Sequence, residues 1–140
     1  MTNNTLLYPI KDKGLWMSHL NTRSIFNKMD EIRYYLKEIN HDIFSVSETW
    51  LTRTIPDSMV SINNYNLIRN DRHWVNPISG EIKKGGGVAI YIKQGLTFSD
   101  ENLRRFDQST KDYESCWVKL LLNNQKNIIV GCVYRINHLE

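Results

Sequence analysis

The chain has few cysteines and no long hydrophobic run. Its two cysteines, Cys116 and Cys132, each lie inside an apolar segment, as is typical of small buried side chains in a reducing compartment. No histidines and cysteines have the spacing of zinc ligands. Residues 1–13 contain no apolar stretch long enough for a signal peptide or a membrane-spanning helix. We therefore expect an intracellular protein, nuclear or cytoplasmic, that does not bind a membrane.

The chain also lacks internal repeats, a domain-splitting linker and a strong excess of one charge. Its 140 residues are enough for one domain with a sizeable core, and its net charge is only +3. That charge is compatible with a polyanionic partner but does not argue for one. Short basic runs such as Lys83-Lys84 are interpreted as ordinary solvated positions. We expect a disordered leader over 1–13, one domain over 14–135 and a diverged tail over 136–140.

One segment has the periodicity of an amphipathic helix. Apolar residues recur there at spacings of four and three, which gives a single stripe: Ile25, Met29, Ile32, Leu36 and Ile39. Ser24 or Asn27 is a candidate cap for its start. Asn40 is expected to end the helix in the left-handed conformation, because Asn is the commonest substitute for Gly there.

Apolar strands are predicted on both sides of this helix. The first covers Leu15–Leu20 and is closed by Asn21, and the second covers Ile43–Ser47 and is closed by Glu48. A strand–helix–strand unit with short connections places both strand ends on one edge of a sheet. Asn21 and Glu48 are therefore expected to project from the same rim, where enzymes often place polar catalytic groups.

Mostly strands are predicted in the rest of the chain. They cover residues 65–69, 88–93, 114–122 and 127–135, the last two as a hairpin, while 94–113 is predicted to be a loop. One early helix followed by strands indicates an α/β fold of the sandwich type, with a mostly antiparallel or mixed sheet.

Five sequence blocks, in order, resemble endonuclease/exonuclease/phosphatase superfamily domains. Within that superfamily they are most similar to the N-terminal endonuclease domain of non-LTR retrotransposons. The blocks are residues 19–30 (HLNTRSIFNKMD), 42–51 (DIFSVSETWL), 65–72 (YNLIRNDR), 85–92 (GGGVAIYI) and 130–135 (VGCVYR). The resemblance implies the first half of a four-layer α/β sandwich that hydrolyses phosphodiester bonds in DNA.

The resemblance also implies roles for three residues. Glu48 would bind a divalent metal, Mg²⁺ or Mn²⁺. Asn21 would help orient the metal site and the scissile phosphate, and Tyr134 would contact the phosphate. Without the resemblance, Glu48 is an ordinary strand-end carboxylate, Asn21 a turn residue and Tyr134 a β-favouring aromatic.

The same resemblance implies further catalytic residues that this sequence does not contain. Family members use an Asp and Asn pair and a His held by a second Asp, all from the second half of the domain. We therefore expect a truncated domain that is inactive alone. An alternative is a non-catalytic remnant that binds nucleic acid or self-associates through a sheet face left without its partner.

A short basic and aromatic segment is the best nucleic-acid-binding candidate by composition. It contains Arg69, Arg72 and Trp74, which combine charge neutralisation with a stacking plane. Arg135 can bind a phosphate or pair with a nearby carboxylate. No histidine has an adjacent acidic residue in a triad-like context, so none is nominated as a catalytic base.

Overall fold

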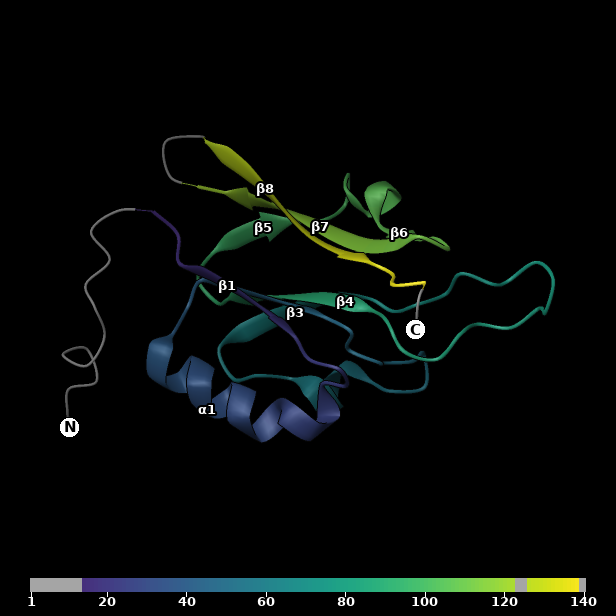
Figure 1. The fold of residues 1–140 in the computed structure, drawn as a ribbon. Helices are drawn as coiled ribbons and strands as arrows, with labels where there is room; N and C mark the ends of the chain where they lie inside the picture. The colour runs from purple at the N-terminus through teal and green to yellow at the C-terminus, as the bar shows by residue number, and fades with distance from the viewer. Residues whose placement is uncertain (1–13, 123–125, 139–140) are drawn as a thin grey trace.

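The computed structural model describes residues 14–122 and 126–138, and the predicted leader and hairpin turn lie outside these residues. Two sheets stack on each other, and the single α-helix packs beneath the first sheet (Figure 1). The first sheet has the strand order β1-β2-β4-β3. Its strands are β1 (Met17–Asn21), β2 (Ile43–Ser47), β3 (Tyr65–Asn70) and β4 (Val88–Lys93).

The second sheet is built around a long antiparallel hairpin. Strand β7 (Tyr113–Leu121) pairs on one side with β8 (Asn127–Arg135) and on the other with two short strands. These are β5 (Thr97–Ser99) and β6 (Gln108–Ser109), both inside the segment predicted to be a loop. That prediction was wrong because strands of three and two residues carry no alternation pattern. Three 3₁₀ turns complete the described elements: η2 (Phe26–Lys28), η3 (Asp57–Val60) and η4 (Arg104–Phe106).

The helix α1 (Met29–Ile39) confirms the predicted apolar stripe but not its predicted cap. Met29, Ile32 and Leu36 are buried, and Asn40 ends the helix at φ 60°, with its N–H donating to the Leu36 carbonyl at 2.9 Å. Neither Ser24 nor Asn27 caps the start. The helix instead begins directly after η2, with no side-chain cap.

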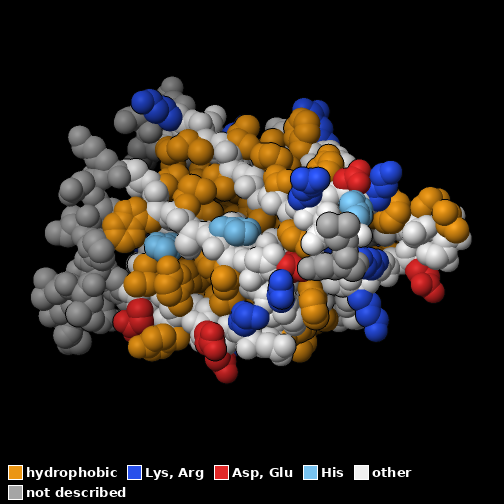
Figure 2. Space-filling view, viewed as in Figure 1, with side chains coloured by type: hydrophobic (Ala, Val, Ile, Leu, Met, Phe, Trp, Pro, Cys, Tyr) orange, Lys and Arg blue, Asp and Glu red, His pale blue; other side chains and the backbone are white. Residues whose placement is uncertain are grey.

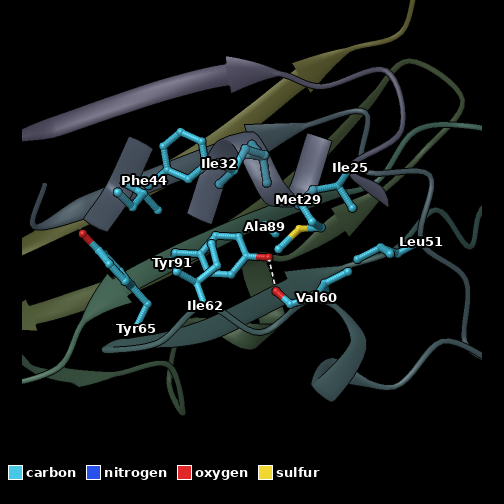
Figure 3. Packing of buried hydrophobic residues seen from close by; sticks show 12 residues of the cluster. Ile25, Met29, Ile32, Phe44, Leu51, Val60, Ile62, Tyr65, Ala89 and Tyr91 are labelled. Atoms are coloured by element: carbon cyan, nitrogen blue, oxygen red, sulfur yellow. Dashed lines mark hydrogen bonds between the residues drawn. The ribbon is translucent and has the colours of Figure 1, made fainter. Parts of the chain in front are cut away.

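Two hydrophobic clusters lie on opposite faces of the first sheet. One lies between α1 and the first sheet, and in it the Tyr91 hydroxyl donates to the Val60 carbonyl at 2.6 Å (Figure 3). The other fills the space between the sheets and includes Cys116 and Cys132, which are cross-strand neighbours. Burial raises the pKa of both thiols, to about 11 for Cys132. The cysteines are therefore buried hydrophobic residues, as predicted.

The two sheets cover each other's inner faces, so these faces are not exposed. Exposed apolar residues on the edge strands include Met17 and Leu20 on β1 and Ile128, Ile129 and Val133 on β8. Figure 2 shows hydrophobic side chains gathered over these two strands. Among the described residues, no helix is both long and apolar enough to cross a membrane.

The packing of α1 predicts how two neighbouring helix positions respond to substitution. Ile32→Ala removes a side chain that is only 4% exposed, and it should lower the free energy of unfolding by about 2–5 kcal/mol. Glu31→Ala, at an exposed position, should change it by about 0.5 kcal/mol or less. Urea denaturation followed by circular dichroism measures both. Equal effects of the two substitutions would contradict the packing described.

Candidate functional site

The parallel pairing of β1 and β2 brings Asn21 and Glu48 to one rim. Asn21 lies opposite Ser47, the last residue of β2, and Glu48 follows directly. Asn21 is exposed and Glu48 is half-buried. Neither side chain hydrogen-bonds or pairs with any residue in the described part of the chain. The structure therefore places the two positions at one edge of the sheet, and neither side chain is engaged by another described residue.

The loops that follow these two strands have an unusual backbone. Among the described residues, six that are not glycine have a positive φ. Two are Asn40 and Asn64, for which this conformation is easily reached. The other four lie in the two rim loops: Arg23 (45°), Ser24 (84°), Glu48 (54°) and Trp50 (58°). Such conformations each cost about 1–3 kcal/mol and persist only where the surroundings enforce them.

Hydrogen bonds from the first rim loop enforce the conformation of the second. The Thr22 side chain, fully buried, donates to the carbonyl oxygen of Glu48 at 2.9 Å. The Ser24 N–H donates to the same oxygen, also at 2.9 Å, and the Thr22 N–H donates to Ser47. Two hydrogen bonds therefore tie the Glu48 carbonyl to the loop after β1, and a third holds the Ser47 carbonyl beside it.

The glycine triplet before β4, residues 85–87, binds the backbone of the Glu48 loop on its other side. The Thr49 N–H donates to the Gly87 carbonyl at 3.2 Å, and the Trp50 N–H donates to the Gly86 carbonyl at 2.8 Å. A Cβ on Gly87 would lie 2.5 Å from Thr49 Oγ1, and one on Gly86 would lie 2.4 Å from the Arg72 guanidinium. Both positions therefore require glycine because of close approach as well as positive φ.

A buried ion pair anchors the triplet to the second sheet. Glu114 on β7 is fully buried, and its Oε2 accepts from Arg72 Nε at 2.7 Å. Its Oε1 accepts from the Gly87 N–H at 3.1 Å. Both carboxylate oxygens are satisfied, which is the condition for a buried charge to be tolerated. No local pattern in the sequence indicates this role for Glu114.

Tyr134 and Arg135 lie at the end of β8, on the same side of the sandwich as the rim (Figure 1). Tyr134 is the register partner of Glu114 and is half-buried against the cluster between the sheets. Arg135 is exposed, and its guanidinium has no partner among the described residues. The structure thus brings both residues to the end of the molecule that carries Asn21 and Glu48.

The segment nominated for nucleic-acid binding is largely occupied by internal contacts. Arg69 pairs with Asp57 at 3.0 Å and Asp71 at 2.9 Å, and its side chain is 13% exposed. The Arg72 side chain is 10% exposed and pairs with Glu114. Trp74 is half-buried in the following loop. These two arginines therefore retain little free charge for a phosphate.

His19 lies exposed on the edge strand β1. Its Nδ1 is 2.7 Å from Ser45 Oγ and its Nε2 is 3.3 Å from Ser47 Oγ. Partial desolvation of the ring lowers the pKa of His19, so the imidazole is predominantly neutral at pH 7. A neutral ring can both accept from one serine and donate to the other.

The donor set at the rim fits part of a magnesium site. Mg²⁺ prefers oxygen ligands, keeps several waters and is usually held by one or two carboxylates together with substrate phosphate. Glu48 supplies one carboxylate and Asn21 an amide oxygen. Within residues 14–122 and 126–138, no three His, Cys, Asp or Glu side chains form a group able to hold a metal by themselves. The rim therefore suits a cation whose other ligands come from water and phosphate.

Comparison with known proteins shows the fold. No family model matches the chain, and no curated protein matches it. The catalytic domain of APE2 from Xenopus laevis superposes with a TM-score of 0.50 at 18% identity, over 86% of this chain and 44% of that one. The 3′ phosphatase NExo from Neisseria, bound to a product DNA hairpin, gives 0.48 at 15% identity, over 83% of this chain and 40% of that one. An AP endonuclease from Archaeoglobus fulgidus gives 0.47 at 17% identity, with the same two coverages.

The chain thus spans less than half the length of the solved structures that it resembles. The likeness to the APE2 domain, together with the stacked sheets and the main helix, shows an α/β sandwich fold like that of the APE2 catalytic domain.

The contact between Gly87 and Thr49 predicts a non-additive pair of substitutions. Gly87→Ala adds both backbone strain at φ +90° and the contact with Thr49 Oγ1. Gly95→Ala is the matched control, because Gly95 has φ +99° and open space around it. Strain alone should lower the free energy of unfolding by about 1–2 kcal/mol, and Gly87→Ala should lower it further.

In the Gly87→Ala chain, Thr49→Ala should remove the part of the destabilisation that comes from the contact with Thr49 Oγ1. We expect a coupling energy of about 0.5 kcal/mol or more between the two substitutions, measured by urea denaturation. In the Gly95→Ala chain the same substitution should be additive. Strict additivity in both chains would show that the triplet does not press on Thr49.

Proposed function

We propose that this chain carries one half of a metal-dependent phosphodiesterase site that acts on DNA. The observation that carries the proposal is the pair formed by Glu48 and Asn21. Both side chains are unpartnered among the described residues, and they share a rim held in a strained backbone conformation by a buried network. The sequence resemblance to retrotransposon endonucleases supports this class, and the solved structures of like fold include a phosphatase bound to DNA.

In this proposal each rim residue has a separate task. The Glu48 carboxylate holds Mg²⁺ or Mn²⁺, and the Asn21 amide orients the same site and the scissile phosphate. Tyr134, at the same end of the sandwich, contacts the phosphate with its hydroxyl. The bound cation would neutralise developing charge on the phosphate. Arg135 is exposed beside Tyr134 and supplies a further positive charge.

The nucleic-acid roles of Arg69, Arg72 and Trp74 remain part of the proposal in a restricted form. The two arginines shape the loop through their ion pairs with Asp71 and Glu114, and so act on the ligand indirectly. Trp74 is half-buried, which leaves part of its ring open to contact.

We further propose that the chain does not cleave DNA by itself. At the described rim Glu48 supplies the carboxylate, and the described histidine that pairs with a carboxylate, His138 with Asp112 at 3.1 Å, lines a different cavity from the one that begins at Trp50. Hydrolysis needs a group that positions and activates the attacking water, which typically contributes 10²–10⁴-fold. We therefore assign to this chain the binding of a metal and a phosphate.

Manganese binding tests the metal site. Addition of Mn²⁺ to the ¹⁵N-labelled chain should broaden the amide signals of Asn21 and Glu48 selectively, because the paramagnetic ion lies at the rim. Glu48→Gln keeps the shape but removes the charge, and it should abolish the selective broadening. Glu31→Gln, on the exposed side of α1, should leave it unchanged.

Unselective broadening, or broadening that persists in Glu48→Gln, would argue against a site at Glu48. Nicking of supercoiled plasmid by the wild-type chain in Mg²⁺, lost in Glu48→Gln, would overturn the proposed inactivity and establish the enzyme.

A second candidate function is self-association, which the free edge of β8 favours. This nine-residue strand pairs with β7 on one side, and no described strand pairs with its other side. Ile129 and Val133 on it are 58% and 54% exposed. A long apolar edge without proline is a template for pairing with another chain. We propose a second copy of this chain as the partner, joined edge to edge through β8.

Val133→Lys should weaken this association by placing a charge in the pairing surface. Sedimentation velocity over a hundredfold range of concentration should show a dimer in the wild-type chain and a shift toward monomer in the variant. Ile78→Lys adds the same charge on a loop residue that is 96% exposed, and it should change nothing. A wild-type chain that stays monomeric throughout would exclude this candidate.

A further inference from the structure

A groove of about 740 Å³ begins at Trp50, two residues after Glu48. One wall is the loop that follows Glu48, and the other is the segment leading into the glycine triplet. Residues from both walls line it, among them Trp50, Arg53, His73, Lys83 and Lys84. Glu48 itself is not among the lining residues, so the groove is connected to the candidate metal ligand through the loop that carries both.

Trp50 is exposed although its backbone is tightly held. Its side chain is 47% exposed, but its N–H donates to Gly86 at 2.8 Å and its φ is fixed at 58°. The indole lies against Gly85, where an added Cβ would be 3.4 Å from the indole nitrogen. An exposed aromatic ring on a rigid support is the usual platform for stacking an unpaired base.

The free charge of the groove is positive. Arg53, Lys83 and Lys84 are exposed, and their side chains have no partner among the described residues. The one acidic residue in the lining is Asp71, which is already paired with Arg69. Lys83 and Lys84, interpreted from the sequence as ordinary solvated residues, thus face a groove in which no unpaired carboxylate opposes them.

We propose that this groove binds a single nucleic-acid strand, with one base stacked on Trp50 and the adjoining phosphates on Lys83, Lys84 and Arg53. The proposal takes its ligand class, DNA, from the function proposed above and adds the surface that delivers the strand to Glu48. Binding in the groove needs no metal, so it is measured separately from the rim. Residues 69–73 also line the groove, but the two arginines among them are internally paired and supply no free charge.

The test is fluorescence anisotropy of a labelled twelve-nucleotide oligo-dT with the full chain, in EDTA, over a series of salt concentrations. Trp50→Ala should weaken binding about tenfold or more, while Trp50→Phe should retain most of it. Joint Lys83→Ala and Lys84→Ala substitution should reduce the magnitude of the log–log salt slope by about 1.4, from roughly 0.7 for each phosphate contact on a single strand.

Two matched controls separate the groove from general effects. Tyr34→Ala removes an aromatic ring that is 69% exposed on α1, outside the groove, and it should leave affinity within about twofold. Joint Arg104→Ala and Arg105→Ala substitution removes two exposed cations from η4, outside the groove, and it should leave the salt slope unchanged. Competition by heparin, a polyanion without bases, should respond to the lysine variants but not to Trp50→Ala.

Three results would overturn the proposal: no binding by the wild-type chain, equal losses in the groove and control variants, or a Trp50→Ala chain that binds like wild type. If the groove variants lose binding as expected while Mn²⁺ fails to broaden the Asn21 and Glu48 signals of the wild-type chain, the rim proposal falls and the groove stands. If broadening succeeds while the groove variants bind normally, the groove proposal falls alone.

Discussion

The buried pair of Glu114 and Arg72 is the interaction on which the rest of the site depends. It joins β7 of the second sheet to the glycine triplet before β4 and satisfies the Gly87 N–H. The triplet in turn holds the backbone of Thr49 and Trp50, so that Glu48 stays in a left-handed conformation. The carboxylate thus sits on a backbone fixed from both sheets, and preorganisation of this kind is what a weakly coordinated cation requires.

The layers explain why this network can be buried. Alternating residues of β4 face the helix on one side and the second sheet on the other, so the strand is apolar and buried from Val88 to Ile92. The pair of charges lies at the end of this layer, where the sheets meet and backbone groups are still available as partners. Apolar surface remains uncovered on the outer face and edges of the second sheet, where Ile129 and Val133 project. In both proposals, the phosphodiesterase half-site and the self-association, a partner can cover this apolar surface.

Short-range patterns predicted the elements that the site needs. The apolar stripe of α1, the left-handed Asn40 and the parallel pairing behind the common rim of Asn21 and Glu48 all follow from local spacing and chain connectivity. The 3₁₀ start of the helix was missed because Ser24 is used elsewhere: it takes a left-handed conformation and binds the Glu48 carbonyl. Tertiary demand outweighed the capping preference at that position.

Long-range pairing accounts for what the sequence did not indicate. Arg72 and Glu114 are 42 positions apart, and nothing local distinguishes their charges from solvated ones. The same pairing removes Arg69 and Arg72 as free cations and leaves Lys83 and Lys84 as the unpaired ones. Trp50 was passed over because one exposed aromatic residue carries no sequence signal. Its importance follows from the glycine backbone beneath it and the groove beside it.

The central claim is that the network presents the Glu48 carboxylate and the Asn21 amide together to one cation. A crystal of the chain soaked in Mn²⁺ and measured at the manganese absorption edge tests this directly. The account predicts one anomalous peak at the rim, about 2.0–2.3 Å from a Glu48 oxygen and with the Asn21 amide facing it. A map without that peak, with the Glu48 carboxylate paired to a neighbouring lysine or arginine, would contradict it.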